Sequence, residues 1–242
     1  MAILNTFQRK ENKYLISKEQ QKALLAMIGD HLIIDEYGES TISNIYLDTP
    51  QHYLIRESID VTEDDKPYKE KVRIRAYGIP GADDNTFIEL KKKFKGIVYK
   101  RRITTTLAKA ERYLKEGVLP EDSQIMREID WTMKKYGMPA PSIMVFYERL
   151  GYFDKDQPCI RITFDRNTRY RMDDLSYEYG TGGKLLFTDD TRIMEIKASG
   201  AYPLWLAEAL DRLNIRKQSF SKVATAYRKD MKEESMPAVM TA

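Results

Sequence analysis

Three short motifs in the sequence place a glutamate two residues before a lysine: Glu11-Asn12-Lys13, Glu89-Leu90-Lys91 and Glu195-Ile196-Lys197. Residues two apart in a β-strand point to the same face, so each glutamate would lie beside its lysine. A single motif of this kind is usually a surface ion pair. Three of them, each on a predicted strand with basic neighbours, favour carboxylates that hold a divalent metal next to phosphate-binding cations, because Mg²⁺ and Mn²⁺ bind carboxylate and phosphate oxygens.

Cations alternate with apolar residues along the segments that would carry these motifs. In Lys71-Val72-Arg73-Ile74-Arg75, three cations share one face and two apolar side chains share the other. The same alternation places together Lys91 and Lys93, Lys100 and Arg102, Tyr147 and Arg149, Arg161 and Thr163, and Glu195 and Lys197. One such strand would mean little, but the pattern recurs.

Two explanations account for this recurrence. In the first, the charged faces are ordinary sheet surface exposed to water. In the second, the apolar faces pack against helices and the charged faces line the inside of a barrel. The cations inside such a barrel would need water or negatively charged partners, because burying like charges together is costly. It would hold a multivalent anion, and phosphate chains suit both the forks of arginine and the point charges of lysine.

The elements that must position these residues are mainly strands. We expect extended segments at 7–16, 43–48, 68–77, 86–94, 97–104, 144–152, 159–165, 184–188 and 191–197. We expect helices at 17–28, 107–115, 122–136, 204–213 and 221–230, the first opened by a capping box over Ser17-Lys18-Glu19-Gln20. The turn-rich loop 78–85 joins one hairpin, and the pairs 144–152 with 159–165 and 184–188 with 191–197 are expected to form two more.

This order of elements predicts the fold class. Eight or nine strands in hairpin order, with a few helices and no evident domain boundary, indicate an α+β fold. We expect an antiparallel eight-stranded β-barrel, closed or nearly closed, with flanking helices. The whole chain, 1–242, would be one domain with its core at about 5–230, and 231–242 would fray.

The segment Ser219-Phe220-Ser221-Lys222 precedes the last predicted helix. A helix N-terminus with hydroxyl groups and a lysine nearby can bind an anion. The segment fits equally well an ordinary serine N-cap followed by a surface lysine, so the sequence leaves both interpretations open.

Composition excludes several classes of protein. The 242 residues include 40 Lys and Arg against 37 Asp and Glu, a net charge of +3, and are 42% apolar, which excludes a disordered chain and argues against a nucleic-acid partner. The single cysteine, Cys159, excludes an internal disulfide framework and fits a reducing compartment. Because there is neither a run of about 18 apolar residues nor a signal-peptide pattern, we expect a cytoplasmic protein without a membrane segment.

The sequence contains few residues that could support other mechanisms of phosphate transfer. Only His31 and His52 are available for a phosphohistidine or a histidine relay. The segment Gly182-Gly183-Lys184-Leu185 lacks the earlier glycine and the hydroxyl of a P-loop.

Taken in order, the motifs resemble the VTC domain, the polyphosphate polymerase domain of the vacuolar transporter chaperone complex, which also occurs in stand-alone bacterial proteins. The resemblance covers about residues 5–230 and groups the chain with the triphosphate tunnel metalloenzymes, alongside RNA triphosphatases and CYTH proteins. The motifs that carry it are Phe7-Gln8-Arg9-Lys10-Glu11-Asn12-Lys13-Tyr14, Tyr46-Leu47-Asp48-Thr49-Pro50, Lys71-Val72-Arg73-Ile74-Arg75, Phe87-Ile88-Glu89-Leu90-Lys91, Arg161-Ile162-Thr163-Phe164-Asp165, Ile193-Met194-Glu195-Ile196-Lys197 and Ser219-Phe220-Ser221-Lys222.

The resemblance implies an antiparallel tunnel barrel that makes inorganic polyphosphate from ATP with Mn²⁺ or Mg²⁺. It implies that Arg73 and Arg75 grip the triphosphate together with Lys91, Arg149 and Arg161. It also implies phosphate-facing or nucleotide-binding roles for Lys13, Lys222, Lys100, Lys197 and Ser219, although the strand register of Lys100 and Arg102 is left open. Glu195 would be the main metal ligand, with Glu89 and Glu11 as weaker candidates. The fungal subunits carry an SPX domain and a membrane segment that this sequence lacks, so a membrane partner would have to supply translocation.

Two alternatives to a polymerase remain within the same fold. Relatives that hydrolyse triphosphate or a nucleoside triphosphate tend to have E-x-E-x-K on the first strand, whereas this chain has Arg9-Lys10-Glu11-Asn12-Lys13, with one carboxylate. A catalytically silent polyphosphate-binding module would be expected to have lost some of these residues, Glu195 above all. The sequence therefore favours the polymerase and leaves both alternatives open.

Overall fold

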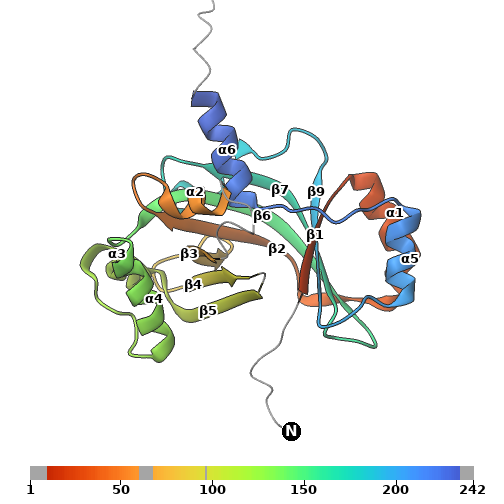
Figure 1. Ribbon diagram of the computed structural model, residues 1–242, viewed down its shortest axis with the longest axis horizontal. Coiled ribbons are helices and arrows are strands. Elements are labelled where there is room, and N and C mark those ends of the chain that lie inside the picture. Colours follow the sequence, from red (N-terminus) through yellow and green to blue (C-terminus); the bar gives the residue numbers. More distant parts are fainter. Residues whose placement is uncertain (1–9, 60–67, 96, 235–242) are drawn as a thin grey trace, which may run out of the picture. The chain divides into compact units, whose positions relative to one another are not determined.

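The computed structural model describes residues 10–59, 68–95 and 97–234. Within these ranges the strands are β1 (Lys10–Ile16), β2 (Leu32–Asp48), β3 (Tyr68–Tyr77), β4 (Asn85–Phe94), β5 (Ile97–Thr106), β6 (Ala140–Asp154), β7 (Arg161–Arg171), β8 (Lys184–Leu185) and β9 (Arg192–Ala198). The α-helices are α1 (Lys18–Ile28), α2 (Tyr53–Ile59), α3 (Leu107–Glu116), α4 (Gln124–Lys135), α5 (Leu204–Arg212) and α6 (Lys222–Glu234) (Figure 1). None of the described helices is long and apolar enough to cross a membrane.

The strands follow the order β1-β9-β7-β6-β2-β3-β4-β5, and the two-residue strand β8 pairs with β7. The pairs β1–β9, β2–β3, β3–β4, β4–β5 and β7–β9 are all antiparallel. This confirms the predicted α+β class, an antiparallel sheet of at least eight strands with flanking helices. The chain divides into two compact units. Unit 1 comprises Met1–Thr41, Tyr147–Thr168 and Phe187–Phe220, and unit 2 comprises Ile42–Phe146, Arg169–Leu186 and Ser221–Ala242.

In unit 2, helices α3 and α4 pack against the apolar face of β3, β4 and β5 (Figure 1). The strict alternation of these strands puts Ile74 and Leu90 on that face, where they are fully buried together with Ile129 of α4. Each side chain of this kind contributes roughly 1.5–3 kcal/mol by leaving water. Thr106 and Ser123 cap the two helices, each accepting a backbone N–H of the first turn. Packing of the apolar face turns the charged face of the strands away from the helices.

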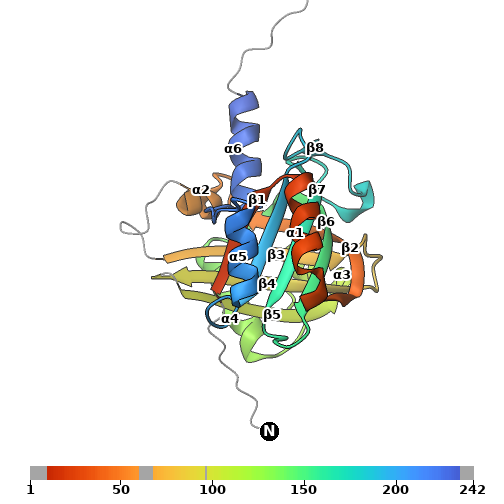
Figure 2. The same ribbon diagram turned by 90° about the vertical axis from the view of Figure 1, so that its right-hand side faces the viewer.

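In unit 1, helices α1 and α5 lie side by side and cover the apolar face of β7 and β9 (Figure 2). Ile162 and Ile196 point from the strands into a core that includes Leu24 of α1 and Leu206 of α5. The predicted capping box at Ser17 is present, because its side chain accepts the backbone N–H of Gln20 and the Gln20 side chain accepts the backbone N–H of Ser17. Here too, the alternate residues of the strands form a separate charged face.

One predicted hairpin is wrong. Residues 184–188 and 191–197 do not pair, because β8 pairs with β7 and β9 is paired along both of its edges, with β1 and with β7. No edge of β9 is left for β8. The turn-rich segment between them misled the prediction.

Several boundaries and one helix also differ from the sequence-based expectation; β7, for example, continues to Arg171 instead of ending at residue 165. β2 begins at Leu32 instead of residue 43, and its early part contains Gly38 with a positive φ of 53°, which hid the alternation. Helix α2 was not predicted. Helix α6 continues to Glu234, so 231–234 are helical and not frayed. The expected extended residues 7–9 and the expected frayed residues 235–242 lie outside the described residues.

Candidate functional site

In unit 2, the strand register places four cationic side chains around the carboxylate of Glu89. Arg73 lies opposite Glu89, and Glu89 lies opposite Arg102 on the next strand. Glu89 Oε2 accepts Arg73 Nε at 2.8 Å and lies 2.6 Å from a terminal guanidinium nitrogen of Arg73. Glu89 Oε1 accepts Arg102 Nε at 2.6 Å and lies 2.7 Å from Lys100 Nζ. Arg75 is also close enough to lower the pKa of Glu89, so cations surround this carboxylate.

Glu89 is therefore held as a carboxylate. Burial alone would raise its pKa, but the charges of Arg73, Arg75 and Lys100 hold it well below its ordinary value. Both of its oxygens already face cations, so this side chain neutralises and positions the arginines. The same register settles the open question about Lys100 and Arg102, because both point to the face of Glu89.

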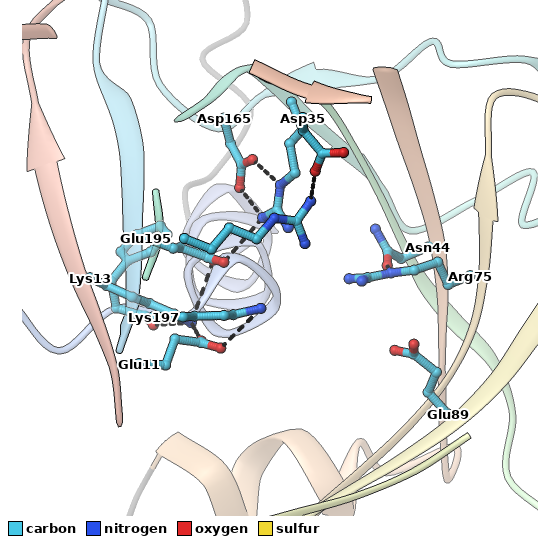
Figure 3. Close-up of polar contacts among 12 residues, drawn as sticks. Glu11, Lys13, Asp35, Asn44, Arg75, Glu89, Asp165, Glu195 and Lys197 are labelled. Carbon is cyan, nitrogen blue, oxygen red and sulfur yellow. Dashed lines mark hydrogen bonds and ion pairs between the residues drawn. The ribbon is translucent and has the colours of Figure 1, made fainter. Parts of the chain in front are cut away.

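Arg75 is fixed by a neutral partner. Its Nε donates to Asn44 Oδ1 at 2.9 Å (Figure 3). The Asn44 side-chain amide donates in turn to the Val145 carbonyl at 3.1 Å. Tyr46, also on β2, accepts a hydrogen bond of 3.0 Å from Arg73. Burial would raise the pKa of Tyr46, but Arg73, Arg75 and Lys222 lower it, which shows how positive this face is.

Beyond Glu89 the same face carries lysines on all three strands. Lys71 on β3 lies opposite Lys91 on β4, and Lys91 lies opposite Lys100 on β5. Lys69 likewise lies opposite Lys93. Like charges directly opposite each other on a sheet are destabilising. We call these five residues, Lys69, Lys71, Lys91, Lys93 and Lys100, the lysine ladder.

The charged face of β3, β4 and β5 carries more cations than carboxylates among the described side chains. Its described side chains include eight cations and one carboxylate, Glu89: the lysine ladder with Arg73, Arg75 and Arg102. The pKa of Lys100 reflects this excess. Burial lowers it, and Arg102 and Arg73 lower it further to about 8, although Glu89 acts in the opposite direction. A polyanion would relieve the repulsion.

The N-terminus of α6 adds a further cation to unit 2. Lys222, the first residue of the helix, is buried and close enough to Tyr46 to lower its pKa. Ser221 caps the helix, accepting the backbone N–H of Ala224, and its Oγ lies 3.1 Å from Lys71 Nζ. The N-cap is thus Ser221, whereas Ser219 belongs to unit 1 and is exposed. A ligand-binding role for Ser219 stays a prediction.

In unit 1, two Glu-x-Lys motifs pair with each other. Because β1 and β9 are antiparallel, Glu11 lies opposite Lys197 and Lys13 lies opposite Glu195. Lys13 Nζ is 3.5 Å from Glu11 and 3.9 Å from Glu195, and Lys197 Nζ is 3.7 Å from Glu11 (Figure 3). Burial and the nearby arginines lower the pKa of Lys197, while the two glutamates oppose that shift. The motifs form one alternating cluster of charges.

Arg149 on β6 ties this cluster to a buried aspartate. It donates two hydrogen bonds to Asp165, at 2.6 and 2.8 Å, and a third to Glu195 at 3.1 Å. Burial would lower the pKa of Arg149, but Asp165 and Glu195 raise it, so its charge is permanent. Nearby, Arg161 pairs with Asp35, and a Cβ added at Gly151 would lie 3.1 Å from the Asp35 carboxylate. Gly151 therefore leaves the room that this pair occupies.

The balance of charge differs between the two units. In unit 1 the charged face carries four cations and four carboxylates among its described residues: Lys13, Arg149, Arg161 and Lys197 with Glu11, Asp35, Asp165 and Glu195. The face of unit 2 is positive and that of unit 1 is neutral. The positive face suits anionic substrate, and the neutral one offers carboxylate ligands.

A divalent metal would have a limited set of protein ligands. Among residues 10–59, 68–95 and 97–234, no three His, Cys, Asp or Glu side chains gather closely enough to hold a metal by themselves. Mg²⁺ commonly binds through one or two carboxylates and completes its shell with water and phosphate oxygens. Glu195 and Glu11, joined through Lys13, fit that donor set. Glu89, with cations on both oxygens, fits it poorly.

The predicted residues on strands all lie on a charged face, whereas Lys222 is the first residue of α6 and Ser219 lies on the exposed segment before that helix. Unit 2 brings together Arg73, Arg75, Lys91, Lys100, Lys222 and Glu89, and unit 1 brings together Lys13, Arg149, Arg161, Lys197, Glu195 and Glu11. The sequence-based search missed the partners that hold them: Asn44, Asp35 and Asp165. Alternation along Arg161-Ile162-Thr163-Phe164-Asp165 could have found Asp165. No local pattern points to the other two.

Comparison with known proteins gives a family match and structures with a related fold. The family model described as the VTC domain matches residues 8–229. No curated protein matches the chain. A solved "putative adenylate cyclase" from Bacillus halodurans shares the fold, with a TM-score of 0.52 at 14% identity over 88% of this chain and 95% of that one. A structure of the same description from Vibrio parahaemolyticus gives a TM-score of 0.47 at 13% identity over 92% and 98% of the two chains.

Proposed function

Because the chain belongs to the VTC domain family, we propose that it is a polyphosphate polymerase that transfers the γ-phosphate of ATP to a growing inorganic polyphosphate chain and releases ADP. The observation that carries the proposal is the lysine ladder. Its lysines lie opposite one another on adjacent strands, and an extended polyanion lying over them would offset the repulsion between these like charges. A single phosphate group would neutralise only part of a ladder that spans three strands.

The two kinds of cation on the positive face suit two tasks. Arg73 and Arg75 are held by fixed partners and present planar forks, which orient the phosphates of a bound nucleotide. The lysines are flexible point charges, which hold a phosphate chain with little directional preference and so allow it to advance. Lys91, Lys100 and Lys222 belong to this second group.

The proposed reaction needs no protein nucleophile. A terminal oxygen of the chain attacks the γ-phosphorus, the bond from that phosphorus to the β–γ bridging oxygen breaks, and the electron pair leaves with ADP. The acceptor is already an anion, so catalysis rests on positioning and on neutralising charge in the transition state. Fixed guanidinium groups meet that need without reorganising.

In unit 1 we assign Glu195 as the principal ligand of Mn²⁺ or Mg²⁺, with Glu11 as a weaker one. The metal would supply Lewis-acid stabilisation of phosphate charge. Arg149 positions Glu195 through its bond at 3.1 Å, and Asp165 holds Arg149 in place. Lys13, Lys197 and Arg161 are assigned to phosphate contacts on the family resemblance. We also place the protein in the cytoplasm, an assignment supported by its free cysteine, Cys159.

Labelled nucleotide distinguishes the polymerase from its alternatives. Purified protein is incubated with [γ-³²P]ATP and Mn²⁺ or Mg²⁺, and the products are separated by gel. Label in long chains that an exopolyphosphatase degrades supports the polymerase. Label released only as orthophosphate would indicate a triphosphatase. Tight binding of polyphosphate with no turnover would indicate a silent binding module.

A further inference from the structure

The turn between β4 and β5 carries an unusual concentration of exposed apolar side chains. Phe94, Ile97, Val98 and Tyr99 are between 42% and 47% exposed. Figure 1 shows β4 and β5 running side by side to this turn. Contiguous exposed apolar surface of this kind usually marks an interaction site. We call these four residues the apolar tip.

The apolar tip places apolar side chains on both faces of the hairpin. Phe94 lies opposite Ile97, and Tyr99 shares their face because it is two residues beyond Ile97. Val98 points to the other face, where it lies opposite Lys93. In the middle of β3 and β4, by contrast, Val72, Ile74 and Leu90 lie on one face and Lys71, Arg73 and Lys91 lie on the other. A flat protein surface could cover only one side of such a tip, whereas a fluid apolar phase would surround both.

Aromatic and cationic side chains flank the apolar tip. Trp131 of α4 is 61% exposed, and the ammonium groups of Lys92 and Lys135 lie 5.8 and 5.7 Å from its ring centre. Both lysines also pair with Glu70, at 3.4 and 3.0 Å, and its single negative charge leaves the pair of lysines with a net positive charge. Lys95, at the turn itself, lies 5.6 Å from the Phe94 ring. Such aromatic rings suit a boundary between apolar and aqueous phases, and lysine stems can follow the apolar surface while the charges stay in water.

From this arrangement we infer that the apolar tip, with Trp131 and the flanking lysines, docks the protein on an anionic lipid bilayer. Protein–protein interfaces are depleted in lysine, whereas this surface interleaves lysine with apolar residues. Each lysine near an anionic membrane adds attraction to the burial of the apolar side chains. The inference stands on exposed side chains and does not depend on the proposed polymerase activity.

Trp131 provides a local probe of docking. The chain has two tryptophans, Trp131 and Trp205, and Trp205 stacks on His31 in unit 1. In a Trp205→Phe background, vesicles of phosphatidylcholine with phosphatidylserine should shift Trp131 emission to shorter wavelength. Brominated lipid should quench that emission. Vesicles of phosphatidylcholine alone should bind at least about tenfold more weakly, because the lysine attraction is absent.

The decisive variant removes apolar surface from the tip. Ile97→Ser combined with Val98→Ser should lower the vesicle partition coefficient by about tenfold or more. The matched control is Leu204→Ser, which changes a side chain that is 73% exposed on α5 and should leave partitioning unchanged. Circular dichroism and the melting temperature of each variant check that it is folded.

Other binding modes give different results. If Arg73→Ala abolishes vesicle binding and the serine variant does not, the positive strand face binds lipid headgroups and the inference is wrong. If sedimentation shows self-association that the serine variant abolishes, with no emission shift on vesicles, the tip is an interface with a second copy and the inference is also wrong. Unquenched Trp131 on brominated vesicles would contradict it directly.

Discussion

Lys71 and Lys91 lie directly opposite each other on neighbouring antiparallel strands, and Lys100 lies opposite Lys91 on the next. Natural sheets avoid such like-charge pairs because they destabilise the fold by a few tenths of a kcal/mol to about 1 kcal/mol each. The strands β3, β4 and β5 accept this cost at several successive positions. A ligand that carries several negative charges would offset this repulsion.

Replacing the central lysine should therefore separate stability from binding. Lys91→Gln should raise the free energy of unfolding of the ligand-free protein by about 0.5 kcal/mol, because two like-charge contacts disappear. The same change should weaken binding of tripolyphosphate. Urea denaturation and titration calorimetry measure the two effects. Lys109→Gln, on the exposed surface of α3, is the control. A variant less stable than the parent would show that Lys91 has a structural role instead.

Glu89→Gln should have the opposite effect on stability. The change removes the charge of the carboxylate that pairs with Arg73, Arg102 and Lys100. The free energy of unfolding should fall by about 2 kcal/mol at low salt, a value reduced from the buried-pair range because these cations are partly exposed. Added tripolyphosphate should restore more stability to this variant than to the parent. Glu121→Gln, on an exposed loop, should change neither quantity.

The lowered pKa of Lys100 predicts a pH dependence of binding. With a pKa of about 8, about half of the Lys100 side chains are neutral at pH 8 in the free protein. A bound polyanion favours the charged form, so binding should take up close to half a proton at pH 8 and almost none at pH 6. Affinity should fall as the pH rises above 8. Calorimetry in buffers of different ionisation enthalpy measures the uptake.

The matched variant for this test is Lys100→Arg, which stays charged throughout the range. It should bind without the proton uptake at pH 8. Equal uptake in the parent and in this variant would assign the proton to another group.

Glu195→Gln tests the metal assignment. Turnover should be lost. The affinity for Mn²⁺, measured through the relaxation of water protons, should fall at least about tenfold, because the variant lacks the carboxylate charge. The fold should persist, since Arg149 keeps both hydrogen bonds to Asp165. Glu11→Gln should give a smaller effect. Unchanged Mn²⁺ binding and turnover in the Glu195 variant would remove this residue from the metal site.

Much of this arrangement follows from local pattern, and the rest depends on register. Alternation fixes which face Lys71, Arg73 and Arg75 share, and β3 was predicted over its observed span, 68–77. The capping box at Ser17 is equally local. The partners of the arginines are distant in the sequence: Asp35 is 126 residues from Arg161, and Asn44 is 31 residues from Arg75. Only the pairing of strands brings them together, and the wrong hairpin at 184–197 shows how weakly turn residues specify that pairing.

The most direct test of the central claim compares affinity for phosphate chains of increasing length. The parent protein and a Lys71→Gln, Lys91→Gln double variant are titrated with tripolyphosphate and with chains of tens of phosphates, at two salt concentrations. If the ladder binds an extended chain, affinity in the parent rises with chain length by about tenfold or more and falls steeply with salt. The double variant should lose most of that gain. An equal dependence on chain length in both proteins would contradict the account.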